Sequence, residues 1–98
     1  MATFITLVKF TPQGLASLQD TCKRAAAFKA AAKKMGARVT DTYWTQGPFD
    51  GVLIFEAPDA AAASALVVRL ASQGNVQTQT VPAHTAAEME KVLAAGGK

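Results

Sequence analysis

Five side chains in this sequence could together form a ligand site: Tyr43, Trp44, Phe49, Asp50 and His84. Asp50 follows an expected turn at the start of a strand, where a raised pKa would let the carboxylate act as a general base. Tyr43 and Trp44 could line a pocket for a flat organic molecule. His84 is the side chain whose ordinary pKa lies near neutrality, so proton transfer would involve it first. These residues predict a site for a small organic ligand.

Each of these residues also has a structural interpretation, and for Asp50, Trp44 and His84 we favour it. Asp50 can accept hydrogen bonds from the turn before it or from Thr45. Trp44 is expected opposite Gly51, where its ring would cover a strand glycine. His84 directly precedes the start of an expected helix and can bond its exposed end. The sequence therefore leaves open whether the group binds a ligand or fills the core.

Two kinds of sequence pattern predict the strands and helices that position these side chains. Runs of β-branched and aromatic residues indicate strands, and apolar residues three or four positions apart indicate helices. The predicted strands are Thr3–Phe10, Ala37–Gln46, Phe49–Glu56 and Val76–Val81, and the predicted helices are Pro12–Met35, Ala60–Gln73 and Thr85–Ala95. The second and third strands are joined by so short a turn that an antiparallel hairpin is the expected connection.

Residues at the helix ends support these boundaries. Thr11 and Asp59 are expected to cap the starts of the first two helices. Gly36 is expected to end the first, because glycine readily takes the positive φ found there. Thr85 and Glu88 match a capping box at the third helix.

The order β-α-β-β-α-β, followed by a short helix, predicts a ferredoxin-like α+β fold formed by one domain over residues 1–98. Right-handed crossovers give a four-stranded antiparallel sheet in the order 4-1-3-2, with both main helices on one face. The first and third strands are apolar on both sides, so the other face would expose an apolar patch. Pairing two such sheets would cover it, which predicts a homodimer or a larger homo-oligomer.

Composition excludes several classes of site. The 98 residues contain one cysteine, Cys22, and one histidine, too few for a disulfide framework or a zinc site. Cys22 falls on the apolar stripe of the first helix and is expected to be buried. No run is apolar enough to cross a membrane and the start lacks a signal peptide, so a cytoplasmic protein is expected. The net charge is +3, but the basic residues of the first helix lack a nucleic-acid motif. We expect no nucleic-acid partner, no metal and no cofactor.

Several segments resemble the GYD domain family, and the likeness covers nearly the whole chain. They are Tyr43-Trp44-Thr45, Gly47-Pro48-Phe49-Asp50, Glu56-Ala57-Pro58-Asp59, Gly74-Asn75-Val76-Gln77-Thr78 and His84-Thr85-Ala86-Ala87-Glu88-Met89. The resemblance implies a ferredoxin-like domain of the dimeric α/β-barrel type, in a family whose biochemical role is largely uncharacterised. The namesake Tyr-Asp of the family is Phe49-Asp50 here. A role that needs the phenolic hydroxyl is therefore not expected.

Two functional hypotheses follow. The first is a small dimeric α/β-barrel protein that binds a small organic molecule between sheet and helices, with Tyr43, Trp44, Phe49, Asp50 and His84 lining the site. Whether it also catalyses a reaction, without a cofactor, is left open. The alternative is a non-catalytic oligomerisation or interaction module, in which the same aromatic side chains only form subunit contacts.

Overall fold

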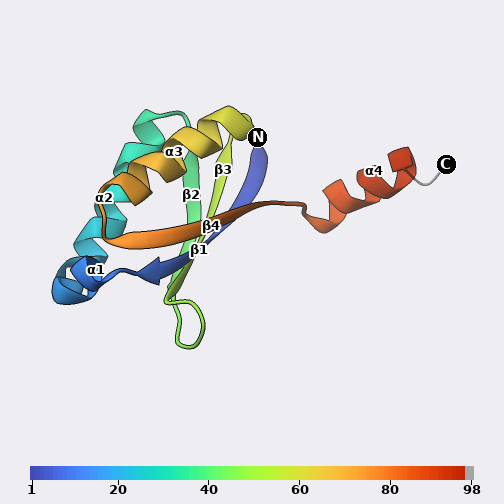
Figure 1. The fold of residues 1–98 in the computed structure, drawn as a ribbon. Helices are drawn as coiled ribbons and strands as arrows, with labels where there is room; N and C mark the ends of the chain where they lie inside the picture. The colour runs from blue at the N-terminus through green and yellow to red at the C-terminus, as the bar shows by residue number, and fades with distance from the viewer. Residues whose placement is uncertain (97–98) are drawn as a thin grey trace.

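A computed structural model describes residues 1–96 as a sheet with helices packed on one of its faces (Figure 1). This confirms the predicted α+β class. In chain order the elements are β1 (Ala2–Phe10), α1 (Pro12–Ala16), the 3-10 turn η1 (Leu18–Asp20), α2 (Thr21–Lys34), β2 (Arg38–Trp44), β3 (Gly51–Ala57), α3 (Ala60–Ser72), β4 (Val76–Ala83) and α4 (Ala86–Gly96).

The sheet is antiparallel throughout and has the order β2-β3-β1-β4. The most apolar strands, β1 and β3, occupy the centre, where a strand has both edges paired and little contact with water. The hairpin register is as predicted: Trp44 lies opposite Gly51 and Tyr43 opposite Val52. A bulge between Val39 and Asp41 shifts the register earlier in β2. Because side chains alternate along a strand, this pairing sends Trp44 and Tyr43 to opposite faces of the sheet.

The core lies between the sheet and the two long helices, α2 and α3. Phe4 of β1 stacks on Phe55 of β3 with ring centroids 5.5 Å apart. Phe28 of α2 and Leu66 of α3 close the core from the helix side, and both are buried. Among the described residues, Thr6 is the polar residue that is buried in this layer. Its hydroxyl shares a 2.7 Å hydrogen bond with the Thr80 hydroxyl. The pairing removes the cost of burying these hydroxyl groups unbonded.

The prediction of one continuous helix over Pro12–Met35 is wrong. The chain forms α1 and the turn η1 before α2 begins at Thr21. The Ser17 hydroxyl donates back to the Gln13 carbonyl at 3.2 Å, a local bond that competes with the helical pattern. Arg24 Nη1 then donates to the Ser17 carbonyl at 2.7 Å. A hydrogen bond from two turns further along the chain thus stabilises the break, and periodicity alone does not reveal it.

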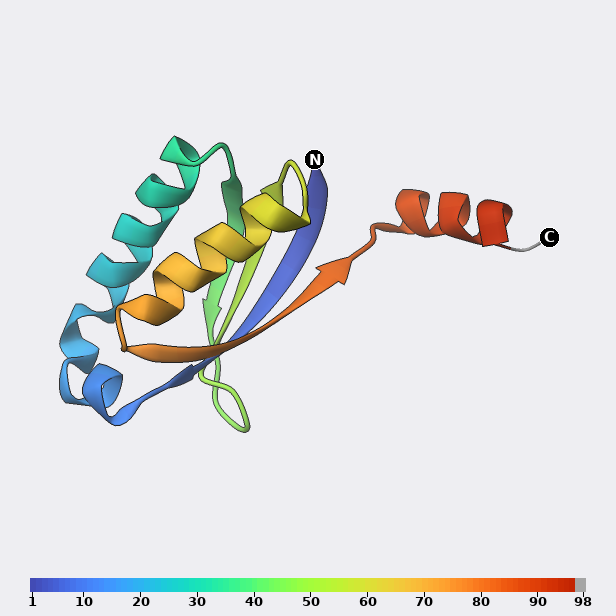
Figure 2. The same ribbon diagram turned by 45° about the horizontal axis from the view of Figure 1, so that its top comes forward.

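The break also changes which side of this segment is buried. Cys22 is exposed, contrary to prediction. Leu15, Leu18 and Met35, expected on the buried stripe, are exposed as well. Once α2 starts afresh at Thr21, its buried side is centred on Phe28 and Ala32. The first turns lie at the end of the helix layer, where the sheet does not extend beneath them (Figure 2).

The predicted helix ends are confirmed. The Thr11 hydroxyl accepts a 3.1 Å hydrogen bond from the Gly14 backbone N–H. The Asp59 carboxylate accepts one of 2.8 Å from the Ala62 N–H. Gly36 follows α2 with φ +80°, which costs glycine little because it has no Cβ.

Two apolar surfaces are left without cover. The sheet face opposite the helices carries Ile5 and Leu7 of β1, Val52 and Ile54 of β3, and the more exposed Tyr43 and Val81. We call this the open sheet face. The second surface is on α4, which extends away from the rest of the chain in both ribbon views (Figures 1 and 2) and has no buried residue.

Candidate functional site

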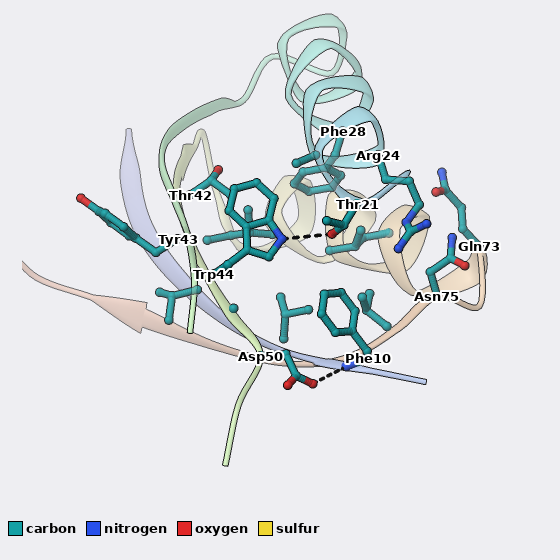
Figure 3. Close-up of a pocket in the computed structure, with 17 residues that line it drawn as sticks. Phe10, Thr21, Arg24, Phe28, Thr42, Tyr43, Trp44, Asp50, Gln73 and Asn75 are labelled. Atoms are coloured by element: carbon teal, nitrogen blue, oxygen red, sulfur yellow. Dashed lines mark hydrogen bonds between the residues drawn. The ribbon is translucent and has the colours of Figure 1, made fainter. Parts of the chain in front are cut away.

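A pocket lies between the start of α2 and the sheet, with a volume of about 70 Å³. Its walls come from β1, β2, β3, α2 and the segment from the end of α3 to the start of β4 (Figure 3). Most of the lining is apolar, and the polar residues in it are Thr21, Arg24, Thr42, Asp50, Gln73 and Asn75. The space between sheet and helices, where the sequence analysis expects a ligand site, thus contains a pocket that is small in volume and mainly apolar.

Trp44 forms one wall of this pocket. Its register opposite Gly51 directs the ring to the helix side of the sheet. The indole Nε1–H donates a 3.0 Å hydrogen bond to the Thr21 hydroxyl at the first residue of α2 (Figure 3). The bond ties the end of β2 to the helix layer, and 47% of the side chain stays exposed. Trp44 thus lines the pocket with part of its ring and exposes the rest to solvent.

Tyr43 contributes to the lining, but its ring points away from the pocket (Figure 3). The side chain is 57% exposed and belongs to the open sheet face. An aromatic pair formed by Tyr43 and Trp44 inside one pocket is therefore not what the structure shows. The strand alternation that separates them could be read from the sequence, since neighbouring residues of a strand face opposite sides.

Asp50 lies at the rim of the pocket and connects the hairpin to β1. Its Oδ2 accepts a 2.8 Å hydrogen bond from the Phe10 backbone N–H. Its own backbone N–H donates to the Val8 carbonyl at 2.8 Å, and its carbonyl accepts from the Thr45 N–H at 2.9 Å. Three hydrogen bonds thus fix the residue in place. The geometry is that of a carboxylate that closes the end of a strand.

Phe49 and His84 are not part of the pocket lining. Phe49 lies in the hairpin loop, where its carbonyl accepts a 2.7 Å hydrogen bond from the Thr45 hydroxyl. His84 is exposed at the other end of β4, just before α4. The structure therefore brings Tyr43, Trp44 and Asp50 together around one end of the sheet and leaves His84 apart.

The segment after His84 forms the predicted capping box. The Thr85 N–H donates to Glu88 Oε1 at 2.8 Å, and the Glu88 N–H donates to the Thr85 hydroxyl at 3.2 Å. The bond from the Thr85 N–H lowers the pKa of Glu88 from its usual value, because the ionised carboxylate accepts it more strongly. The start of α4 is therefore set locally, by residues of α4 and the position before it.

Arg24 is the functional candidate that the sequence analysis missed, since the basic residues of the first helix were considered there only for nucleic-acid binding. Its guanidinium lies at the pocket and makes three hydrogen bonds: Nη1 to the Ser17 carbonyl at 2.7 Å and hydroxyl at 3.1 Å, and Nη2 to the Gly14 carbonyl at 3.4 Å. A signal was present, because Arg24 precedes the buried Phe28 by one helical turn and so shares its side of α2.

Other kinds of site find no support in residues 1–96. No three His, Cys, Asp or Glu side chains in this range are grouped so that they could hold a metal ion. Within the same range, every helix is too short or too polar to span a bilayer.

In a comparison with known proteins, residues 4–93 match the model of the GYD domain family. A protein of Thermus thermophilus, named glutamine synthetase and cystathionine beta-lyase binding protein, is 34% identical over 90 residues, which cover 91% of this chain and 95% of that protein. The crystal structure of TTHA0845 from the same organism superposes with a TM-score of 0.57 at 23% identity, covering 88% of this chain and 96% of that one. The structural likeness supports the α+β fold.

Proposed function

The chain belongs to the GYD domain family, and from this premise we propose that it is a non-catalytic protein-binding module that associates with itself. Its 34% identical relative is named for binding two enzymes, glutamine synthetase and cystathionine beta-lyase. Enzymes of this kind are the partners we propose here. The proposal corresponds to the interaction module that the sequence analysis kept as its alternative.

The observation that carries the proposal is the uncovered α4. Its apolar side consists of Met89 together with Val92 and Leu93 one turn later, and all three are substantially exposed. A helix of 11 residues is marginal in water without packing, because nucleation costs more than its few hydrogen bonds return. Burial of an apolar side chain of this size stabilises by about 1.5–3 kcal/mol when complete. A partner surface that covers these three side chains would therefore hold α4 in place.

The open sheet face supports self-association. Ile5, Leu7, Val52 and Ile54 form a continuous apolar band across the two central strands. Packing two such faces, as in a dimeric α/β-barrel, would remove this band from water. The proposed assembly is a homodimer in a reducing compartment such as the cytoplasm, consistent with the single Cys22.

Binding to enzymes is tested by biolayer interferometry with the full chain immobilised, and glutamine synthetase and cystathionine beta-lyase from the same genome as analytes. Leu93→Glu puts a charge on the apolar side of α4, where 59% exposure means that folding tolerates it. Ala94→Glu adds the same charge to a neighbouring exposed position, turned away from that side. We expect Leu93→Glu to weaken binding at least about tenfold, as for loss of an interface hot spot, and Ala94→Glu to bind like wild type. Equal binding by both variants, or no binding by wild type, would contradict the proposal.

Self-association is tested by light scattering coupled to size-exclusion chromatography. The molar mass that light scattering gives for wild type should be twice that of the monomer. Val81→Glu charges the open sheet face and should shift the equilibrium toward monomer, whereas Val68→Glu makes the same change on the exposed side of α3 and should not. A monomeric wild type, or dissociation by Val68→Glu alone, would show that the open sheet face is not the interface.

A second candidate function, binding of a small organic molecule, is supported by the pocket at Trp44 and Arg24. Its volume of about 70 Å³ is below the few hundred Å³ typical of drug-sized ligands, so only a small molecule would fit. Saturable chemical-shift changes of pocket amides on titration with small organic molecules would support it, and uniform or absent changes would argue against it.

A further inference from the structure

We propose that the pocket between α2 and the sheet binds a short-chain aliphatic carboxylate, with the carboxylate on Arg24 and the hydrocarbon chain between Phe28 and Leu53. The inference rests on the second candidate function, small-molecule binding, and names the class of ligand. It is independent of whether α4 binds an enzyme, because α4 contributes nothing to the lining.

The shape and chemistry of the pocket select a small apolar body. Its inner walls are Val8, Phe28, Leu53, Leu70 and Val76, all hydrocarbon side chains. A water molecule needs roughly 10–15 Å³ of such volume, and a cavity of about 150 Å³ accommodates benzene. At about 70 Å³ the pocket holds more than one water but less than an aromatic ring. A branched chain of three or four carbons behind the carboxylate fits this range.

Arg24 supplies the charge for the other end of the ligand. A guanidinium has five N–H donors, and three hydrogen bonds to neutral oxygens of Ser17 and Gly14 leave two for a ligand. Within residues 1–96 the ion pair is formed by Arg38 and Glu56, and no carboxylate in this range pairs with Arg24. Two remaining donors on a planar group match the two oxygens of a carboxylate. Arg24 also lies in the first turns of α2, whose positive dipole end favours an anion.

The other charged residue of the lining sets the orientation of the ligand. The Asp50 carboxylate is turned to the Phe10 N–H, on the side of the pocket away from Arg24 (Figure 3). Its negative charge would repel a ligand carboxylate placed there. The carboxylate therefore belongs at the Arg24 end, with the hydrocarbon chain directed toward Trp44. A neutral molecule of the same shape would gain the apolar contacts but not the charged hydrogen bonds.

The test is a titration of the full, isotopically labelled protein with sodium isovalerate, followed by ¹H–¹⁵N correlation spectra. Isovaleramide serves as the neutral isostere and sodium benzoate as the larger carboxylate. We expect saturable shifts at the amides of Arg24, Phe28 and Leu53 with isovalerate, and binding at least about tenfold weaker with the amide or with benzoate. Isovaleramide binding as tightly as isovalerate would overturn the role of Arg24 while leaving small-molecule binding intact. No saturable shifts with any of the three would overturn the inference as a whole.

Two pairs of variants make the assignment specific. Arg24→Gln should weaken isovalerate binding at least about tenfold, whereas Lys23→Gln removes the same charge from the neighbouring exposed position and should not. Because Arg24 also holds the turn at Ser17, its substitution could disturb the fold. Ala25→Leu therefore provides a second test: it fills the pocket and should abolish binding with Arg24 in place, while Ala26→Leu on the exposed side should bind normally. Unchanged binding by Ala25→Leu, or equal losses in Lys23→Gln and Arg24→Gln, would overturn the proposed site.

Discussion

Replacement of Asp50 tests whether this residue is a structural link or a reacting group. In Asp50→Ala the Phe10 N–H, at the end of β1, loses its 2.8 Å acceptor. The backbone bonds of residue 50 to Val8 and Thr45 do not depend on its side chain and should remain. The variant therefore removes one hydrogen bond and leaves the hairpin pairing in place.

The expected loss can be worked out from this contact. A hydrogen bond to a charged group contributes about 1.5–3 kcal/mol, and the lower part of that range applies because both residues are only half-buried. We expect Asp50→Ala to lower the free energy of unfolding by about 1–2 kcal/mol. For a domain of this length that corresponds to about 4–10 °C in Tm. Asp50→Asn keeps an acceptor oxygen and should lose about half as much, because neutral hydrogen bonds are weaker than charged ones.

The measurement is urea unfolding at one fixed protein concentration, since self-association makes stability concentration-dependent. Asp41→Ala is the control, because it removes an exposed carboxylate from the neighbouring strand. If Asp50→Ala and Asp41→Ala unfold with the same midpoint, or if Asp50→Ala is more stable than wild type, the structural interpretation is wrong. A stabilised variant would instead indicate a carboxylate kept for function at a cost in stability.

Three further predictions concern single positions. Gly14→Ala should destabilise by about 1–3 kcal/mol in urea unfolding, because an added Cβ would overlap the carbonyl oxygen of a neighbouring loop, whereas Gly96→Ala meets open space and should not. Acidification through the lowered pKa of Glu88 should fray the start of α4, because the hydrogen bond from Thr85 stabilises the folded form only while the carboxylate is ionised. Amide hydrogen exchange should show this loss of protection in wild type and not in Glu88→Gln. Trp44→Phe loses one half-exposed hydrogen bond and should cost only about 0.5–1.5 kcal/mol by thermal unfolding; a larger loss would show that the ring is a core residue.

Local signals in the sequence predicted much of this fold because they depend on neighbours in the chain. The caps at Thr11 and Asp59, the glycine at position 36 and the capping box of Thr85 are each satisfied within four residues. The hairpin register follows equally from a short turn and from strand alternation. Such features need no knowledge of the rest of the molecule.

The candidate site was only partly predictable, because it depends on contacts between segments far apart in sequence. Asp50 was expected to accept a hydrogen bond from its own turn, but its carboxylate accepts one from Phe10, 40 residues away. His84 shares no pocket with the hairpin, since β4 carries it to the other end of the sheet. Trp44 and Asp50, which are close in the sequence, both line the pocket, whereas His84, far along the chain from the hairpin, does not.

Taken by itself, the sequence determined the order of the four strands and the main helices, the caps at several helix ends, and the apolar character of both sheet faces. These follow from backbone propensity, capping and periodicity, which act over a few residues. Only the tertiary structure decided that the first helix breaks at Ser17, that Arg24 rather than a lysine reaches the pocket, and that α4 is left without cover. Each of these depends on where a distant segment lies, because a half-buried cation or an unpacked helix is recognised only when its neighbours in space are known.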